Sequence, residues 1–169
     1  MKINKYILIF SLLLIGCAHK TKLDLFPKIY YELPKTILVL PPINKSTSTD
    51  ATEYYSTTIA EPLSLIGYYV FPIEITKEVL KSEGIYDASI LKNIPMNNFR
   101  EYFDADAVLF TEIIEWDKSF YVVGGNVEVH IEFILKSTNS EEILWSYKGN
   151  IKVDTSSGDS EIPGLAGIL

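Results

Sequence analysis

Hydrophobic residues follow two different patterns in the two halves of the chain. A continuous apolar run over residues 36–40, stopped by Pro41-Pro42, predicts a short strand buried on both faces. A polar loop then leads to Asp50-Ala51-Thr52-Glu53, which has the spacing of a helical capping box. Apolar residues continue at helical spacing up to Gly67, with Pro62 expected to bend the helix: Tyr55, Ile59, Leu63 and Ile66. A second strand over 68–72 completes a β-α-β unit.

Two further helices are predicted before the pattern changes. The first spans residues 76–82, with Val79 and Leu80 facing inward and Gly84 as its C-cap. The second spans residues 95–103 and carries its aromatic side chains on one face, with a helical turn over 87–91 between the two helices.

The second half of the chain reads as strands. Residues 107–116 form a long apolar segment, and apolar residues then alternate with polar ones from 121 to 135 and again from 143 to 153. We interpret Gly124-Gly125 as a bulge or bend in the middle strand, and residues 137–141 as a turn. Lysines of the last strand are positioned to meet acids of the middle strand, namely Lys148 and Lys152 opposite Glu128 or Glu132.

These elements predict an α/β fold with one mixed sheet. A β-α-β-α half is followed by a three-stranded antiparallel meander, and residues 35–154 form a single domain. Helices must cover at least one face of the buried first strand. Residues 155–169 are expected to be a polar loop and a short apolar tail.

The N-terminus has the layout of a signal peptide. Lys2 and Lys5 precede an apolar run over 6–15, which is about half of the ~20 residues that a membrane-spanning helix needs. The segment ends in Leu14-Ile15-Gly16-Cys17, which resembles the bacterial lipobox. That resemblance implies cleavage between Gly16 and Cys17 and a diacylglyceryl group on the Cys17 sulfur. The alternative is an ordinary buried cysteine. Because Ala18 rather than aspartate follows, an outer-membrane destination is expected.

The residues after the cysteine are expected to be a tether. Segment 17–34 is interrupted by Pro27 and Pro34 and shows neither helical nor strand periodicity, so we expect an irregular segment. Its apolar residues should let part of it lie against the domain: Phe26, Ile29, Tyr30 and Leu33.

Charge and composition exclude several classes of function. The signal segment holds two lysines and no acid, so the mature chain carries 13 basic and 22 acidic residues, a net charge of −9. An acidic chain lacks the basic face that nucleic-acid binding requires. The net negative charge also disfavours broad adhesion of the chain to anionic lipid headgroups, so we assign membrane attachment to the lipid on Cys17. The chain has one cysteine, so no disulfide within the chain can form.

The sequence offers little catalytic chemistry. The motifs of zinc proteases, serine hydrolases and dithiol redox proteins are absent. Glu128, His130 and Glu132 share one side of a strand, which we interpret as a solvated face rather than a metal site. Two acid pairs are interpreted as structural: Asp104/Asp106 beside a strand start, and Glu112/Glu115 on opposite faces of a strand. We therefore predict a non-enzymatic protein without metal or cofactor.

One loop is the alternative candidate for a small-ligand site. It leaves the first strand and enters a helix N-terminus, the place where open α/β sheets bind anions, and its leading residues are Asn44, Lys45, Ser46 and Thr47. The loop 44–49 contains no glycine, and its Ser and Thr residues also suit a helix-capping loop.

Three segments resemble a family of bacterial lipoproteins of unknown function that includes a genome-derived neisserial surface antigen. They are residues 37–47, 62–72 and 103–109, supported by the lipobox and by Ile143-Leu144-Trp145. The resemblance implies a fold like the amino-terminal domain of TolB and of CsgG-type envelope lipoproteins. It also implies a non-enzymatic, protein-binding role in envelope assembly or export, with a CsgG-like lipoprotein as partner. The family would lead us to expect a longer C-terminal region.

Overall fold

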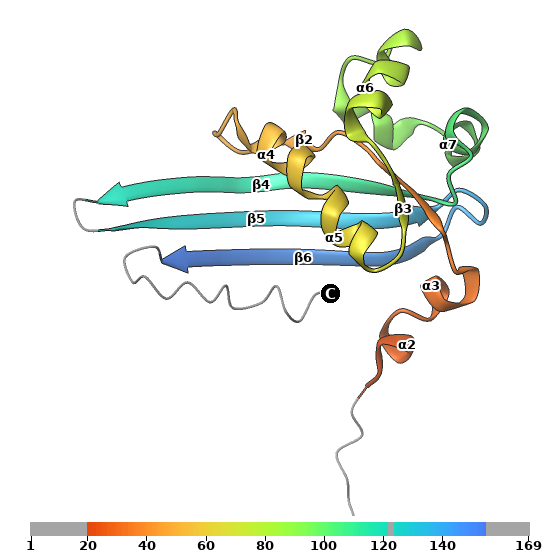
Figure 1. Ribbon diagram of the computed structural model, residues 1–169, viewed down its shortest axis with the longest axis horizontal. Coiled ribbons are helices and arrows are strands. Elements are labelled where there is room, and N and C mark those ends of the chain that lie inside the picture. Colours follow the sequence, from red (N-terminus) through yellow and green to blue (C-terminus); the bar gives the residue numbers. More distant parts are fainter. Residues whose placement is uncertain (1–19, 122–123, 155–169) are drawn as a thin grey trace, which may run out of the picture.

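The computed structural model describes residues 20–121 and 124–154, and its centre is a mixed sheet (Figure 1). Within those residues the sheet has six strands in the order β3-β1-β4-β5-β6, with β2 paired to β4. The strands are β1 (Thr36–Val39), β2 (Ile43–Asn44), β3 (Tyr69–Phe71), β4 (Ala107–Tyr121), β5 (Gly124–Ser137) and β6 (Ile143–Asp154). The helices are α2 (Lys22–Leu25), α3 (Pro27–Glu32), α4 (Ala51–Thr58), α5 (Ala60–Leu65), α6 (Ile73–Ser82), the 3-10 helix η1 (Ala88–Asn93) and α7 (Met96–Phe103).

Strand β1 lies between β3 and β4 and runs parallel to both. Its side chains alternate between two hydrophobic clusters, and Ile37, Leu38 and Val39 are each at most 1% exposed. Ile37 and Val39 pack in a cluster with residues of α4 and α5, whereas Leu38 packs with residues of α6, η1 and α7. The prediction of a strand buried on both faces, inside an α/β fold with a mixed sheet, is confirmed.

The helix after the loop forms, with a break that the sequence explains. Pro62 has no N–H to donate to the carbonyl of Thr58, and the helix divides at Ile59, one turn before the proline, into α4 and α5. Gly67 ends it with φ +100°, a conformation that only glycine adopts without strain. Two details were predicted wrongly: Asp50 makes no side-chain capping bond, and Ile66 is 53% exposed.

Strands β4, β5 and β6 form the predicted antiparallel meander, but β4 is longer than predicted. Strand β4 continues to Tyr121, which pairs with Gly124 at the start of β5. Gly124-Gly125 therefore lies at the start of β5, paired with the end of β4, and the interpretation as a bulge or bend in the middle strand was wrong. The predicted cross-strand pairs form, with Lys148 Nζ 2.8 Å from Glu132 Oε1 and Lys152 Nζ 3.1 Å from Glu128 Oε2.

The segment expected to be irregular contains the helices α2 and α3. Thr21 begins α2 with a full capping box, in which its hydroxyl accepts from Asp24 N–H and the Asp24 carboxylate accepts from Thr21. Ile29 packs against the core, as expected for a segment that partly lies on the domain. Leu33, expected to do the same, is 65% exposed and adopts φ +48° at the end of α3.

Candidate interaction surface

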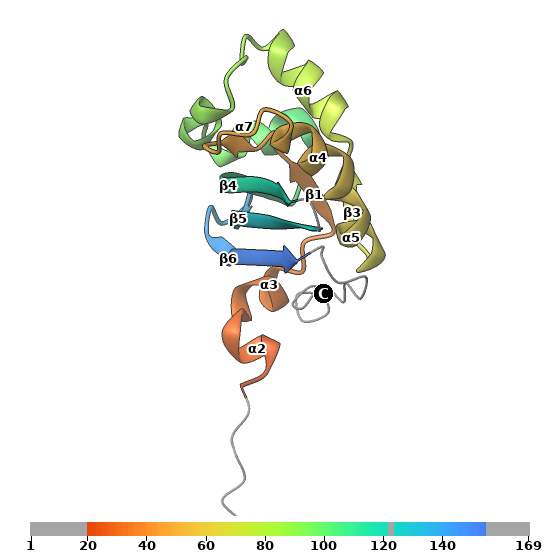
Figure 2. The ribbon, with the colours of Figure 1, turned by 90° about the vertical axis from the view of Figure 1, so that its left-hand side faces the viewer.

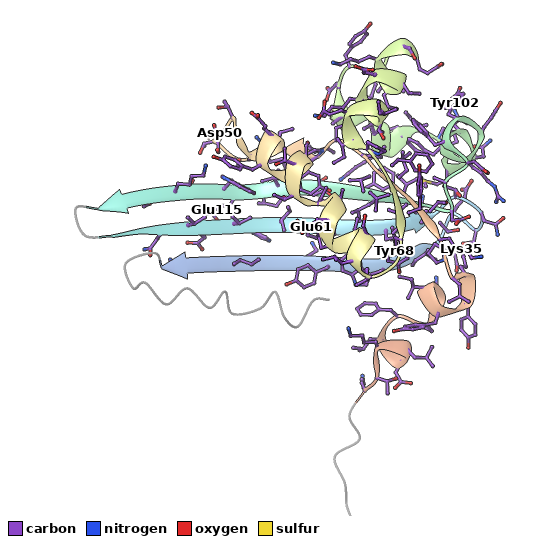
Figure 3. All side chains as sticks on the ribbon, viewed as in Figure 1. Lys35, Asp50, Glu61, Tyr68, Tyr102 and Glu115 are labelled. Atoms are coloured by element: carbon purple, nitrogen blue, oxygen red, sulfur yellow. The ribbon has the colours of Figure 1, made fainter. Side chains whose placement is uncertain are left out.

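A groove opens between α6, η1 and α7, on the side of the molecule where Figure 3 labels Tyr102. Its volume is about 310 Å³. Apolar side chains make most of its walls, and polar side chains contribute at three positions: Val79, Leu80, Ile85, Ile90, Ile94, Pro95, Phe99, Tyr102 and Phe103, with Glu83, Asn93 and Asn98.

The groove has a fixed floor and accessible walls. Phe99 and Leu80 are 1% and 4% exposed and belong to the core cluster beneath the groove. Ile90 and Tyr102 are 43% and 50% exposed, so their apolar surfaces face solvent. A hollow with apolar walls and few polar groups can accept apolar side chains from another molecule.

Local sequence signals hold the three elements at these positions. Gly84, at φ +80°, turns the chain out of α6. Asp87 then caps η1 by accepting a hydrogen bond from Ser89 N–H at 2.8 Å, and that bond lowers the pKa of the Asp87 carboxyl. Asp104 ends α7 in the left-handed conformation, with φ +51°.

The predicted ligand loop is folded upon itself. The Asn44 Oδ1 atom accepts from Ser46 N–H at 3.0 Å and from the Ser46 hydroxyl at 2.7 Å, while Asn44 Nδ2 donates to the Ser48 carbonyl at 2.7 Å. Lys45 reaches away from the loop to Glu112 Oε2 at 2.6 Å, and Thr47 is exposed. Asn44 and Ser46 are therefore occupied within the loop, and Lys45 is occupied by Glu112 of β4. Asp50 and Glu53 add negative charge at the start of α4, which disfavours an anion there.

Both members of the first acid pair do structural work, as the sequence indicated. Asp106 Oδ2 accepts from the backbone N–H groups of Lys35 and Thr36 at 2.8 and 3.0 Å. Asp104 lies at the C-cap of α7. The pair therefore fixes the start of β1 and the end of α7 and is not arranged around a shared substrate position.

The second acid pair was placed on the wrong faces. A register shift occurs between Ile113 and Glu115, so that Glu112 pairs with Glu132 and Glu115 pairs with His130. Because Glu132 and His130 are two residues apart in β5, Glu112 and Glu115 lie on one face of the sheet.

Lysines neutralise this polar face. Glu112 is 13% exposed at its side chain and forms ion pairs with both Lys45 and Lys92. In the ranges 20–121 and 124–154, no group of three or more histidine, cysteine or acidic side chains is arranged to hold a metal ion. The arrangement is an ion-pair network on a strand face.

The proposed lipidation residues, Gly16 and Cys17, lie outside the described residues, as does the tail over 155–169. In the part of the chain that is described, no helix is both long and apolar enough to cross a bilayer.

Sequence reasoning did not identify the groove, although one signal pointed to it. Residues 83–95 carry three isoleucines and lack a helical or strand period, and all three contribute to the groove: Ile85, Ile90 and Ile94. Their convergence depends on how α6, η1 and α7 meet over one core cluster, which no local pattern encodes.

Comparison with known proteins shows that the chain is similar to lipoproteins. Residues 28–169 match the family described as "Putative lipoprotein GNA1162-like". A curated relative, "Putative lipoprotein NMB1124/NMB1162" of Neisseria meningitidis serogroup B, is 30% identical over 136 residues. The match covers 80% of this chain and 62% of that protein, so the chain spans less than two thirds of its relative.

Solved structures share the fold. The crystal structure of lipoprotein GNA1162 from Neisseria meningitidis aligns with a TM-score of 0.67 at 30% identity, covering 80% of this chain and 92% of that one. The PelC dodecamer from Paraburkholderia phytofirmans aligns with a TM-score of 0.51 at 17% identity, covering 73% and 76% of the two chains. At that identity the second likeness concerns the fold alone.

Proposed function

The chain belongs to the GNA1162-like family of lipoproteins, a family of unknown function, and from that membership we propose that it is a non-enzymatic outer-membrane lipoprotein. In this proposal Cys17 carries the lipid anchor after cleavage at Gly16, residues 17–34 link it to the domain, and the domain binds another protein of the cell envelope. A CsgG-like lipoprotein of an assembly or export system is the partner that we propose.

The groove between α6 and α7 carries the binding part of the proposal. Its walls offer accessible apolar surface from Ile90 and Tyr102 above the buried ring of Phe99. Burying apolar surface contributes roughly 25 cal/mol per Å², so an inserted side chain would gain affinity without any reactive group. We propose that the occupant is the apolar face of an amphipathic helix from the partner.

The position of the groove supports this use. Figures 1 and 2 show α6 and α7 above the sheet and α2 and α3 below it. A domain anchored through residues that precede α2 would therefore present the groove away from its own membrane, where a partner protein can approach.

Site-specific photo-cross-linking in living cells tests the groove. A photoreactive phenylalanine analogue at Tyr102 should give a discrete adduct with one envelope protein. The same analogue at Leu65 is the matched control, because Leu65 is 75% exposed and lies on α5. The adduct should disappear when Ile90→Asp places a charge in the groove wall. Identical adducts from both positions, or an adduct unaffected by Ile90→Asp, would refute a groove-bound partner.

The anchor has a separate test. Cys17→Ser should abolish labelling with radioactive palmitate and release the protein from the outer-membrane fraction. Ala18→Asp should redirect the labelled protein to the inner membrane if the outer membrane is its destination. Palmitate labelling that persists in Cys17→Ser would rule out lipidation at this residue.

A further inference from the structure

Large apolar side chains are exposed along α2 and α3. Leu23 and Leu25 are 50% and 53% exposed, and Tyr30, Tyr31 and Leu33 are 44%, 83% and 65% exposed. These side chains lie within eleven residues of one another in the sequence, and they are exposed to solvent although other apolar side chains are buried in the core of the domain. Leucine and tyrosine side chains with this exposure suit the boundary between water and lipid headgroups.

The same segment is basic in an otherwise acidic protein. Residues 20–35 contain four lysines and two acids, whereas the whole chain has a net charge of −7. One of the acids, Glu32, is turned toward the domain, where it accepts hydrogen bonds from Ser137 and Ser140. Lys28 is likewise paired with the domain, through Glu142. Of the remaining charged residues of the segment, three are lysines and one is an acid, so its charge still complements anionic lipid headgroups.

The short connection to Cys17 limits how far this surface can lie from a lipid anchor. Five residue steps separate Cys17 from Lys22, the start of α2, so the two can be at most about 18 Å apart at ~3.3–3.6 Å per residue. This step rests on the proposed lipid at Cys17. With that anchor in place, α2 lies at or close to the headgroup region of the bilayer.

Three contacts attach α3 to the domain. Ile29 packs against the core, Glu32 is held by the turn after β5, and Lys28 Nζ lies 3.1 Å from Glu142 Oε1. Figure 2 shows α3 next to β6, with α2 extending beyond it.

We propose that the exposed surface of α2 and α3 is a membrane-contacting surface. Its leucine and tyrosine side chains insert among the headgroups of a bilayer that contains anionic lipid. The lysines other than Lys28, which is paired with Glu142, lie next to the phosphates. This contact, together with the lipid on Cys17, orients the domain so that the groove between α6 and α7 faces away from the membrane.

Vesicle co-sedimentation of the mature chain with Cys17→Ser tests this surface without the lipid. Vesicles of phosphatidylethanolamine and phosphatidylglycerol should retain the protein, and phosphatidylcholine vesicles should retain less. The triple variant Leu23→Ser, Leu25→Ser, Leu33→Ser should lower the bound fraction about tenfold at limiting lipid. The matched control removes exposed apolar side chains elsewhere and should bind like the parent: Leu65→Ser, Ile75→Ser and Tyr86→Ser.

Two outcomes would overturn the membrane-contacting surface: equal binding of the triple variant and the parent, or equal loss in the control variant. Tyr31→Ser provides a check that does not depend on folding, because it removes a side chain that is 83% exposed; it should weaken binding measurably with an unchanged circular dichroism spectrum. Palmitate labelling of the native protein is read separately. A protein that lacks labelling yet binds vesicles would refute the lipid anchor and leave the surface in place.

Discussion

The carboxylate of Glu32 joins the end of α3 to the turn between β5 and β6, with its Oε2 atom 2.5 Å from the hydroxyl oxygen of Ser137. Ser140 donates to the other oxygen of the same carboxylate. The Ser137 side chain is fully buried, and its oxygen also accepts from the N–H groups of Asn139 and Ser140 at 3.0 and 3.1 Å. One carboxylate thus organises a turn and attaches the N-terminal segment to the domain.

Glu32→Ala should release α3 from this turn. The substitution removes two charge-assisted hydrogen bonds and leaves the buried Ser137 hydroxyl without its acceptor, so unfolding free energy should fall by about 1–3 kcal/mol. Hydrogen–deuterium exchange should become faster across residues 27–33. Lys28→Ala is the control, since its ion pair with Glu142 is about half exposed and should contribute at most ~1 kcal/mol. Exchange that is unchanged in Glu32→Ala would contradict the attachment.

A buried hydroxyl pair should make the largest polar contribution to packing between α4 and the sheet. The hydroxyl oxygens of Tyr55 and Thr111 lie 2.6 Å apart, and both side chains are at most 4% exposed. Burial raises the pKa of the Tyr55 hydroxyl, so it remains protonated in neutral solution. Tyr55→Phe and Thr111→Val should each lower unfolding free energy by about 1 kcal/mol.

The double variant Tyr55→Phe, Thr111→Val separates this bond from general packing. Removing both hydroxyls leaves neither one unpaired, so the double variant should lose less stability than the two single variants together. Urea unfolding of the four proteins measures the difference. Strict additivity would show that the hydrogen bond contributes nothing to stability.

Gly149 leaves room for an aromatic ring on β6. A Cβ atom at this position would lie 2.5 Å from Cε1 of Tyr147 and 3.0 Å from its hydroxyl oxygen. The Tyr147 ring stacks on Trp145, with ring centres 6.1 Å apart and an interplanar angle of 2°. Gly149→Ala should therefore displace the ring from Trp145 at a cost of about 1 kcal/mol. In a Trp116→Phe background the fluorescence of Trp145 should change, whereas Asn150→Ala should leave it unaltered.

Local periodicity was sufficient to predict most of the fold. The apolar run at β1 and the alternation in β5 and β6 reflect how many faces of each strand are buried, which the sequence records directly. The positions of Gly67 and Gly84 at helix ends followed from their conformational freedom. Each of these features depends on residues that are near one another in the chain.

Several wrong predictions concern features that are determined by contacts between segments far apart in the sequence. The shift near Ile114 leaves no mark in the sequence Glu-Ile-Ile-Glu, yet it moves Glu115 to the other face. The alternation of apolar and polar residues also continues from Tyr121 into β5, which concealed the boundary between β4 and β5. Helix α3 is held by contacts such as Glu32 with Ser137, and the groove requires α6, η1 and α7 to meet over one core cluster. Lipidation of Cys17 stays a prediction from the sequence, because Cys17 lies outside the described residues.

The last prediction concerns acid stability and the carboxylate that holds the start of β1. Burial tends to raise the pKa of Asp106. Hydrogen bonds from the Lys35 and Thr36 backbone and from the Thr36 hydroxyl, with the charge of Arg100, outweigh that effect and hold the pKa below its ordinary value. A carboxyl with a lowered pKa in the folded state stabilises the fold above its unfolded pKa of about 4 and loses that contribution as the pH falls further.

Asp106→Asn should therefore be less stable than the parent at neutral pH, because an amide carries no charge and accepts the two backbone N–H groups less strongly. Below about pH 4 the difference should shrink as the parent's carboxylate becomes protonated. Urea midpoints across this range measure the convergence. Glu101→Gln, which removes an exposed carboxylate from α7, corrects for the loss of one negative charge. A constant difference between Asp106→Asn and the parent from pH 7 to pH 2 would mean that the stabilisation comes from packing rather than from the charge of Asp106.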